Sequence, residues 1–330
     1  MAAPGPKNLI TDVAGIRVGQ AEDARVRTGV SVILPDSAAI GACAVAGGGP
    51  GTRETDLLAG GTLVDQVDAI FLSGGSAFGL GAADGVMAGL KQAGRGFAMT
   101  ARPGVPPTPI VPGAILYDLA NGGDKDWGDV APYAAMGRAA FDAAGEAFAL
   151  GRAGAGFGAR AGGHPGGTGS ASIVTGDGLT VGAIACVNSF GSVLMPGTQA
   201  YWAWPHEVNG EFGGAHPPAG WSADADDWGA AKANPALGQN TTIACIATDV
   251  ILTPDETRRV AQMALSGFSR AIRPVFAPFD GDAVFVLSTG RTELPGPAPL
   301  NVTRIGELAA STLARAIARG VYEARLQEGG

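Results

Sequence analysis

Two adjacent threonines, Thr241 and Thr242, stand where a polar segment meets an apolar run. The junction reads Gly-Gln-Asn-Thr-Thr-Ile-Ala over residues 238–244. A hydroxyl group in this position can attack the carbonyl of the preceding residue and form an ester that water then opens. The cut would fall between Asn240 and Thr241 and would leave Thr241 as a new amino terminus.

A threonine at a chain end carries its own base. The α-amino group has an ordinary pKa of about 7.7–8.0, close to working pH, so that it can accept the proton of the hydroxyl. Thr241 would then supply both nucleophile and base. The local sequence alone favours another interpretation, in which Thr241 and Thr242 are β-branched residues that begin a strand.

Other kinds of site are less well supported. The three histidines lie in loop-like sequence without the i, i+4 pairing of a helical zinc site: His164, His206 and His216. The three cysteines are far apart and predict neither a disulfide framework nor a zinc site: Cys43, Cys186 and Cys245. We therefore expect no metal and no cofactor.

The glycine-rich segments 46–55 and 72–81 give neither GxxxxGK[ST] nor a correctly spaced GxGxxG, so we interpret them as tight turns or walls of an active site.

Composition narrows the range of partners. The chain has 330 residues, a net charge of −8 and no cluster of lysine and arginine, which argues against binding to nucleic acid or to an anionic membrane. Small neutral or cationic ligands fit this charge. The amino-terminal sequence lacks the pattern of a signal peptide and no apolar stretch reaches membrane-spanning length, so we expect a cytoplasmic protein.

The first half of the chain mixes β-type runs with helical segments. Strands are predicted at 29–34, 39–46, 67–72 and 109–116. Helices are predicted just after Ser73 and within 131–149, whereas the small residues of 151–171 predict a loop.

The second half has a clearer pattern. Residues 179–195 predict a strand, a turn with Asn188 at the bend, and a second strand. Residues 201–237 show no periodicity and predict a surface segment. Residues 240–289 predict strand, helix, loop and strand, with Thr253 and Glu256 as the capping box of the helix.

Long motifs along nearly the whole chain resemble one known family. They include NLITDVAGIRVGQAED, GGGPGTRETDLL, IFLSGGSAFGLGAADGV, IVPGAILYDL, CVNSFG, NTTIACIATD and DGDAVFVLSTG. The chain resembles the DmpA/NylC family of self-processing L-aminopeptidase/D-esterases, β-peptidyl aminopeptidases and nylon-oligomer hydrolases. The Asn-Thr junction resembles the version found in the nylon-oligomer hydrolases.

The resemblance implies roles for particular residues. Thr241 would be the nucleophile and Asn240–Thr241 the bond that is cut. Asn188, in CVNSFG, would donate to the developing oxyanion, and Tyr117, in AILYDL, would line the pocket. From the residues alone, Asn188 reads as a turn former and Tyr117 as a core aromatic.

An acidic pair, Asp280 and Asp282 in FDGDAVFVL, would orient the terminal threonine and its amine. From the residues alone, the pair reads as an Asp-Gly turn before a strand.

One feature departs from the family pattern. Relatives usually carry a lysine shortly after the GRAGAG-like loop, where it assists the nucleophile. This chain has lysines only at Lys7, Lys91, Lys125 and Lys232, and none between 151 and 200. Arg160 and His164 are the polar candidates there, and an arginine could stabilise charge without serving as a base.

The resemblance also implies a fold and an assembly. It predicts a four-layer αββα sandwich of α/β class, in which 1–330 forms one hydrolase domain cut into 1–240 (α chain) and 241–330 (β chain). We expect a homo-oligomer, a tetramer of cut protomers, that binds small peptide, amide or ester substrates.

The expected activity is aminopeptidase-like hydrolysis of amides or esters that carry a free amino terminus. A nylon-oligomer hydrolase is the alternative of the same class. An uncut binding protein and an acetyltransferase of the ornithine-processing type are alternatives of another class.

Overall fold

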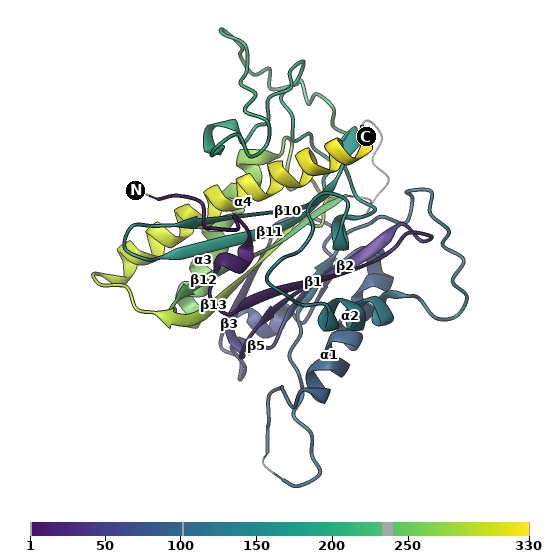
Figure 1. Ribbon diagram of the computed structural model, residues 1–330, viewed down its shortest axis with the longest axis vertical. Helices are drawn as coiled ribbons and strands as arrows, with labels where there is room; N and C mark the ends of the chain where they lie inside the picture. The colour runs from purple at the N-terminus through teal and green to yellow at the C-terminus, as the bar shows by residue number, and fades with distance from the viewer. Residues whose placement is uncertain (1, 101, 233–239, 330) are drawn as a thin grey trace.

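The computed structural model describes residues 2–100, 102–232 and 240–329. Two β-sheets pack face to face, and a pair of helices covers the outer face of each sheet (Figure 1). The predicted four-layer αββα arrangement is therefore confirmed. Residues 233–237 of the aperiodic segment, and Gly238 and Gln239 of the junction, lie outside the described residues.

The two sheets differ in size and topology. The five-stranded sheet has the order β1 (Ile16–Asp23), β2 (Thr28–Pro35), β6 (Ile70–Ser73), β7 (Gly113–Ile115), β4 (Thr52–Arg53). The six-stranded sheet has the order β10 (Gly167–Val174), β11 (Thr180–Asn188), β12 (Thr241–Val250), β13 (Ala283–Thr292), β3 (Ala39–Val45), β5 (Gln66–Val67). A small hairpin pairs β8 (Arg160–Ala161) with β9 (His164–Pro165).

The helices divide between the sheets. α1 (Ala82–Gln92) and α2 (Tyr133–Asp142) pack on the five-stranded sheet, and α3 (Pro254–Ala271) and α4 (Ala298–Glu328) pack on the six-stranded sheet. Short 3-10 helices join these elements: η1 (Ile10–Asp12), η2 (Asp56–Leu58), η3 (Ser76–Gly81), η4 (Gly154–Gly156) and η5 (Trp204–His206).

The start of α3 confirms the predicted capping box. The Thr253 hydroxyl accepts from the N–H of Glu256 at 3.3 Å, and the Glu256 carboxylate accepts from the N–H of Thr253 at 2.8 Å. These bonds satisfy backbone donors that the helix itself cannot pair.

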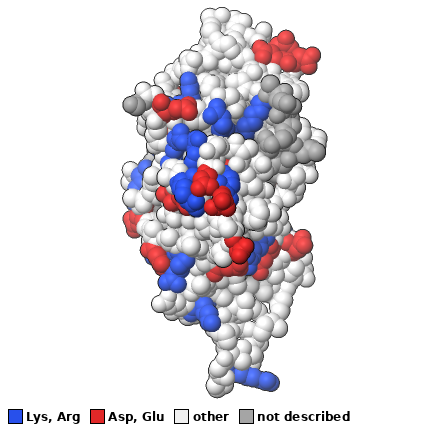
Figure 2. Space-filling view, turned by 90° about the vertical axis from the view of Figure 1, so that its right-hand side faces the viewer, with Lys and Arg blue, Asp and Glu red and all other residues white. Residues whose placement is uncertain are grey.

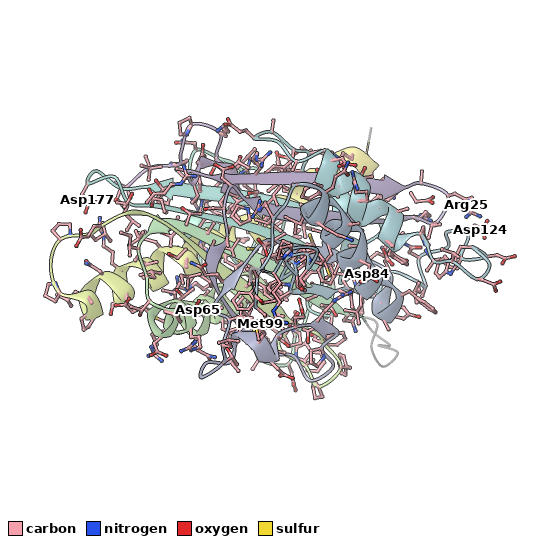
Figure 3. All side chains as sticks on the ribbon, turned by 90° about the horizontal axis from the view of Figure 1, so that it is seen from below. Arg25, Asp65, Asp84, Met99, Asp124 and Asp177 are labelled. Atoms are coloured by element: carbon pink, nitrogen blue, oxygen red, sulfur yellow. The ribbon has the colours of Figure 1, made fainter. Side chains whose placement is uncertain are left out.

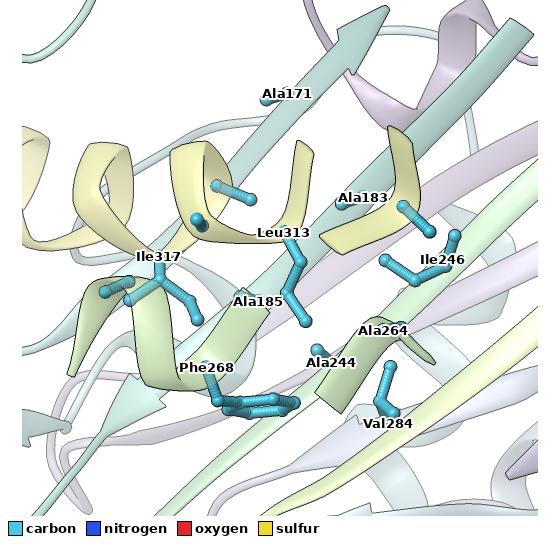
Figure 4. Packing of buried hydrophobic residues seen from close by; sticks show 14 of the residues in the cluster. Ala171, Ala183, Ala185, Ala244, Ile246, Ala264, Phe268, Val284, Leu313 and Ile317 are labelled. Atoms are coloured by element: carbon cyan, nitrogen blue, oxygen red, sulfur yellow. The ribbon is translucent and has the colours of Figure 1, made fainter. Parts of the chain in front are cut away.

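Strand β12 is buried on both faces, and its side chains alternate between two cores. Ile243 and Cys245 point into the core between the sheets. Ala244 and Ile246 point toward α3 and α4, where Figure 4 shows them close to Phe268 and Leu313. This alternation determines which face of the sheet each residue near the start of β12 occupies.

The carboxyl-terminal portion of the chain lies in the middle of the six-stranded sheet. β12 pairs antiparallel with β11, and β13 pairs antiparallel with β3, while β12 and β13 pair parallel to each other. β11 and β3, which precede residue 240 in the chain, thus flank β12 and β13, which follow it.

The prediction of a loop over 151–171 is partly wrong, because its last residues form β10. Small side chains let α4 pack directly on this strand. A Cβ atom added to Gly169 would lie 1.9 Å from the carbonyl oxygen of Ala316 in α4. The glycines that resembled loop sequence are therefore required by close packing of helix on strand.

Of the predicted strands, one is shorter than expected and another does not form. Within 109–116 only β7 forms, because Pro109 and Pro112 cannot donate to a strand ladder. Within 179–195 the second strand is absent: Asn188 is the last residue of β11, and beyond it only the isolated bridges Ser192–Arg273 and Leu194–Tyr201 form. Asn188 therefore lies at a strand end.

Charged side chains of both signs are intermixed on the face shown in Figure 2. Figure 3 places Arg25 and Asp124 together at one end of the molecule, where they form an ion pair of 2.7 Å, and Asp177 at the opposite end.

Within the described ranges, no helix is long and apolar enough to cross a membrane. The same ranges contain no group of three or more His, Cys, Asp or Glu residues that could hold a metal ion.

The close packing at Gly169 predicts a loss of stability in Gly169→Ala. We expect the free energy of unfolding to fall by about 1–3 kcal/mol, because the added methyl group meets backbone that cannot rotate away. The midpoint of urea unfolding measures this change. Gly81→Ala is the control, since a Cβ there has no neighbour within 4 Å. Equal midpoints for the two variants would contradict the packing argument.

Candidate active site

Thr241 and Asn188 lie directly opposite each other at the ends of two paired strands. Thr241 is the first residue of β12, and the β11–β12 register pairs it with Asn188, the last residue of β11. Both are buried, with 3% of their surface exposed. By the alternation of β12, Thr241 shares a face with Ile243 and points into the space between the sheets.

The carbonyl group before Thr241 lies in a polarising environment. The Thr241 hydroxyl contacts the carbonyl oxygen of Asn240. The same oxygen accepts a hydrogen bond from the N–H of Gly281 at 3.2 Å. A hydroxyl against a carbonyl group whose oxygen already accepts a backbone N–H is the arrangement needed for attack with stabilisation of the oxyanion.

Asn188 is held by groups from two different parts of the fold. Its Oδ1 accepts from the backbone N–H of Arg160 at 2.9 Å, and its Nδ2 donates to the carbonyl oxygen of Tyr117 at 2.8 Å. Tyr117 follows β7 of the five-stranded sheet, whereas Asn188 ends a strand of the six-stranded sheet. The site therefore forms where the ends of strands from both sheets meet.

Asp280 and Asp282 are both 1% exposed beside the start of β12. Asp282 accepts from the N–H of Thr242 at 2.7 Å and from the N–H of Phe276 at 3.1 Å. Burial raises the pKa of Asp280 to about 6. Burial, and then the charge of Asp280, raise the pKa of Asp282 to about 7. Burial thus favours the protonated form of both carboxyl groups.

Thr242 lies on the opposite face of β12 from Thr241. Its backbone N–H binds Asp282, while its buried hydroxyl has no partner among the described residues. Thr242 thus contacts the acidic pair through its backbone.

Lys232 belongs to this site, although it lies outside residues 151–200, where the family resemblance leads one to expect a lysine. Its Nζ donates to the Asn240 side-chain oxygen at 2.8 Å and to the Asn188 carbonyl oxygen at 3.2 Å. Its backbone N–H donates to the carbonyl oxygen of Phe190 at 3.0 Å. Burial lowers the pKa of Lys232 to about 7.

The residues considered in place of a family lysine are located differently. The Arg160 side chain is exposed and donates to the carbonyl oxygen of Gly163 at 3.1 Å, so that Arg160 contacts Asn188 through its backbone N–H. His164 lies in the small hairpin, and burial lowers its pKa. The sequence feature that could have identified Lys232 is that it is a single lysine eight residues before Asn240, in a stretch with few basic residues.

A cavity of about 210 Å³ opens beside Asn188 and Lys232, the strand partner of Thr241 and the lysine that contacts Asn240. Its lining includes Tyr117, Asp118, Asn121, Arg160, Asn188 and Lys232. A second, more apolar pocket of about 690 Å³ shares Lys232 and is lined by aromatic residues, including Phe190, Trp228, Phe276 and Phe279. The first cavity has the size for a small substrate group.

The comparisons with known sequences agree with one another. The profile of peptidase family S58 matches residues 8–330. An uncharacterized aminopeptidase of Mycobacterium tuberculosis is 44% identical over 96% of this chain and 94% of its own length. A 6-aminohexanoate-oligomer endohydrolase of Kocuria sp. is 30% identical over 94% of this chain and 84% of its own length.

Solved structures share the fold. A β-aminopeptidase of Burkholderia sp. has a TM-score of 0.69 at 24% identity, over 97% of this chain and 88% of that one. The L-aminopeptidase D-Ala-esterase/amidase of Ochrobactrum anthropi, described as a variant of the Ntn hydrolase fold, has a TM-score of 0.69 at 21% identity, over 98% and 88%.

The position of Gly281 predicts that Gly281→Ala impairs chemistry at Thr241. An added Cβ would lie 2.7 Å from the Thr241 hydroxyl oxygen and 2.9 Å from the carbonyl oxygen of Gly49. We expect cutting before Thr241 to slow on the order of 10-fold to 100-fold, because a displaced nucleophile loses its alignment. Mass spectrometry over time measures the rate.

Gly49→Ala is the matched control, since a Cβ there meets only ordinary contacts, at 3.6 Å from Asp280 and Phe279. Unchanged cutting in Gly281→Ala would show that the hydroxyl position is not critical.

Proposed function

This chain belongs to peptidase family S58, and on that basis we propose that it cuts itself between Asn240 and Thr241 and then uses Thr241 to hydrolyse small substrates. The resemblance to the DmpA/NylC family is thereby confirmed, and the chain is a hydrolase of peptide bonds. The contact of the Thr241 hydroxyl with the carbonyl oxygen of Asn240 supports the cutting step most directly.

In the cutting step, the Thr241 hydroxyl attacks the carbonyl carbon of Asn240 and gives up its proton. Negative charge develops on the Asn240 oxygen, where the Gly281 N–H stabilises it. The peptide nitrogen takes up a proton as its bond to carbon breaks, which frees the amine of Thr241 and leaves Asn240 esterified to the Thr241 hydroxyl oxygen. Water then opens the ester, which releases the carboxylate of Asn240 and restores the hydroxyl of Thr241.

In turnover, the freed amine accepts the proton of the Thr241 hydroxyl as that oxygen attacks the substrate carbonyl. Asn188, opposite Thr241, is placed to donate an amide N–H to the oxyanion. Asp282 accepts from the N–H of Thr242 and so fixes the backbone next to the nucleophile. Water completes hydrolysis of the acyl-enzyme.

The charge and size of the site support substrates with a free amino terminus. Asp280 is buried near Thr241, and its Oδ1 has no partner among the described residues. A substrate ammonium group would supply a donor and a compensating charge. The cavity of about 210 Å³ suits a single residue or a short linear acyl group.

A nylon-oligomer hydrolase is the second candidate. The relative named 6-aminohexanoate-oligomer endohydrolase supports it, as does the Asn-Thr junction. The proposals of an uncut binding protein and of an acetyltransferase lose support, because the family is one of peptidases. A panel of p-nitroanilides, amino-acid esters and aminohexanoate dimers would distinguish the hydrolytic candidates.

We further propose that residues 1–240 and 241–330 remain one unit after cutting, and that the protein works as a homo-oligomer, a tetramer, in the cytoplasm. Exposed Met99 and Val105, in the segment that projects beyond α1, offer apolar surface for contact between copies. Light scattering of the cut protein measures the assembly.

Replacing the nucleophile should abolish both reactions. Thr241→Ala removes the attacking oxygen, so we expect an intact chain and no detectable hydrolysis of amino-acid p-nitroanilides. The wild type should give two fragments, 1–240 and 241–330, by mass spectrometry.

Thr241→Ser keeps a hydroxyl and should retain both reactions at a reduced rate. Turnover by Thr241→Ala, or full activity in an uncut wild-type chain, would contradict the proposed role of Thr241.

A further inference from the structure

In the uncut chain, Asn240 occupies the position that the acyl part of a substrate must take. In the cutting step Asn240 is the acyl group transferred to Thr241, and in turnover a substrate residue takes the same place. Asn240 is 1% exposed, so its side chain is enclosed by the site. The contacts of Asn240 therefore indicate what the acyl subsite recognises.

One side chain contacts the Asn240 amide directly. The Nζ of Lys232 donates to Asn240 Oδ1 at 2.8 Å, while Nδ2 of the same amide has no partner among the described residues. Recognition of the Asn240 side chain within the described site thus depends on its oxygen. A carbonyl or carboxylate oxygen three bonds beyond the α-carbon is a property of asparagine and aspartate.

Lys232 is held in place independently of Asn240. Its backbone N–H binds the Phe190 carbonyl oxygen at 3.0 Å, and its Nζ also donates to the Asn188 carbonyl oxygen at 3.2 Å. Nearby, the Phe190 ring packs edge to face on Trp228, with ring centroids 6.0 Å apart. The amine therefore keeps its anchors when the acyl group in front of it changes.

We propose that Lys232 is a positioning and specificity-determining residue whose amine binds the side-chain oxygen of the acyl residue, first Asn240 and then the amino-terminal residue of an asparagine-like substrate. The proposal rests on the proposed function, since it takes Thr241 as the nucleophile. It gives this chain a lysine in the active site that does not follow the GRAGAG-like loop.

The charges around Lys232 support such a role. Burial opposes the ammonium form most strongly and brings the pKa of Lys232 to about 7, while the charge of Asp280 stabilises that form and the charge of Arg160 opposes it. Both the ammonium and the neutral amine carry N–H donors, so the contact with an acyl oxygen survives loss of the proton.

A double-mutant cycle on self-cutting tests the proposal. Lys232→Met removes the donor, and Asn240→Leu removes the acceptor with little change of shape. We expect each variant to cut on the order of 10-fold to 100-fold more slowly, because a buried hydrogen bond to a charged group is lost. The double variant should cut no more slowly than the slower single variant, since both changes remove one interaction.

Matched controls separate this effect from a general loss of structure. Lys91→Met alters an exposed lysine in the last turn of α1 and should cut like the wild type. Lys232→Arg keeps a donor and should recover part of the rate. If Lys232→Met fails to fold, Asn240→Leu alone decides, because it leaves the lysine in place.

The cut enzyme gives a second readout. Wild type should show a higher kcat/KM for asparagine p-nitroanilide than for leucine p-nitroanilide, which has a similar shape without the oxygen. Lys232→Met, incubated until fully cut, should lose that preference while still hydrolysing the leucine substrate.

Additive losses in the cycle, wild-type cutting by Asn240→Leu, or equal loss on both substrates would overturn the role of Lys232. Failure of the proposed function would look different, because the wild type itself would stay uncut or Thr241→Ala would retain turnover.

Discussion

Backbone hydrogen bonds between β11 and β12 determine the geometry of the site. Their antiparallel register runs from the pair Val181–Thr248 to the pair Asn188–Thr241, in the middle of the six-stranded sheet. Because side chains alternate along a strand, a slip by one residue would turn Thr241 toward α3 and α4 and away from Asn188. The apolar residues on both faces of β12 make such a slip costly, so the packing of two cores fixes the position of Thr241.

Around this register the fold buries several ionisable groups that would be more stable in water. Lys232 and the acidic pair lose their contact with water, and backbone and side-chain partners replace it only in part. Burial therefore lowers the pKa of Lys232 and raises the pKa values of Asp280 and Asp282. The free-energy cost of burying these ionisable groups is concentrated at the start of β12, where the proposed mechanism requires proton transfer. Elsewhere, buried hydroxyl groups such as Ser170 and Thr248 bind backbone carbonyls of neighbouring strands and carry no charge.

The resemblance of the motifs to a known family predicted the layered fold, and the apolar run after Thr242 predicted the central strand. The sequence did not predict β10, since glycines that allow close approach of a helix look the same in sequence as glycines of a loop. It also gave no prediction of α4, whose alanine and glycine residues are buried against the sheet along much of its length. Small side chains carry a weak periodic signal, although they permit the closest packing.

The site was predicted in part. Thr241, Asn188, Tyr117, Asp280 and Asp282 lie together, as motif positions implied, while their chemical roles stay predictions. The motifs could not predict the position of Lys232, because it lies in a segment without periodicity. A backbone hydrogen bond to Phe190 holds Lys232 beside Asn240, and no local sequence pattern indicates that contact. Arg160 was assigned from chain position, and position alone could not tell that its backbone faces Asn188 while its side chain faces solvent.

Under the proposed mechanism, the order of strands in the six-stranded sheet also governs when the enzyme becomes active. β12 and β13 lie between strands that come earlier in the chain, so neither portion can complete this sheet by itself. The Gly281 N–H reaches the Asn240 carbonyl only once β13 has taken its place beside β12. Maturation would then act as a checkpoint on folding, and a chain with misassembled strands would stay inert and would not become an unregulated hydrolase.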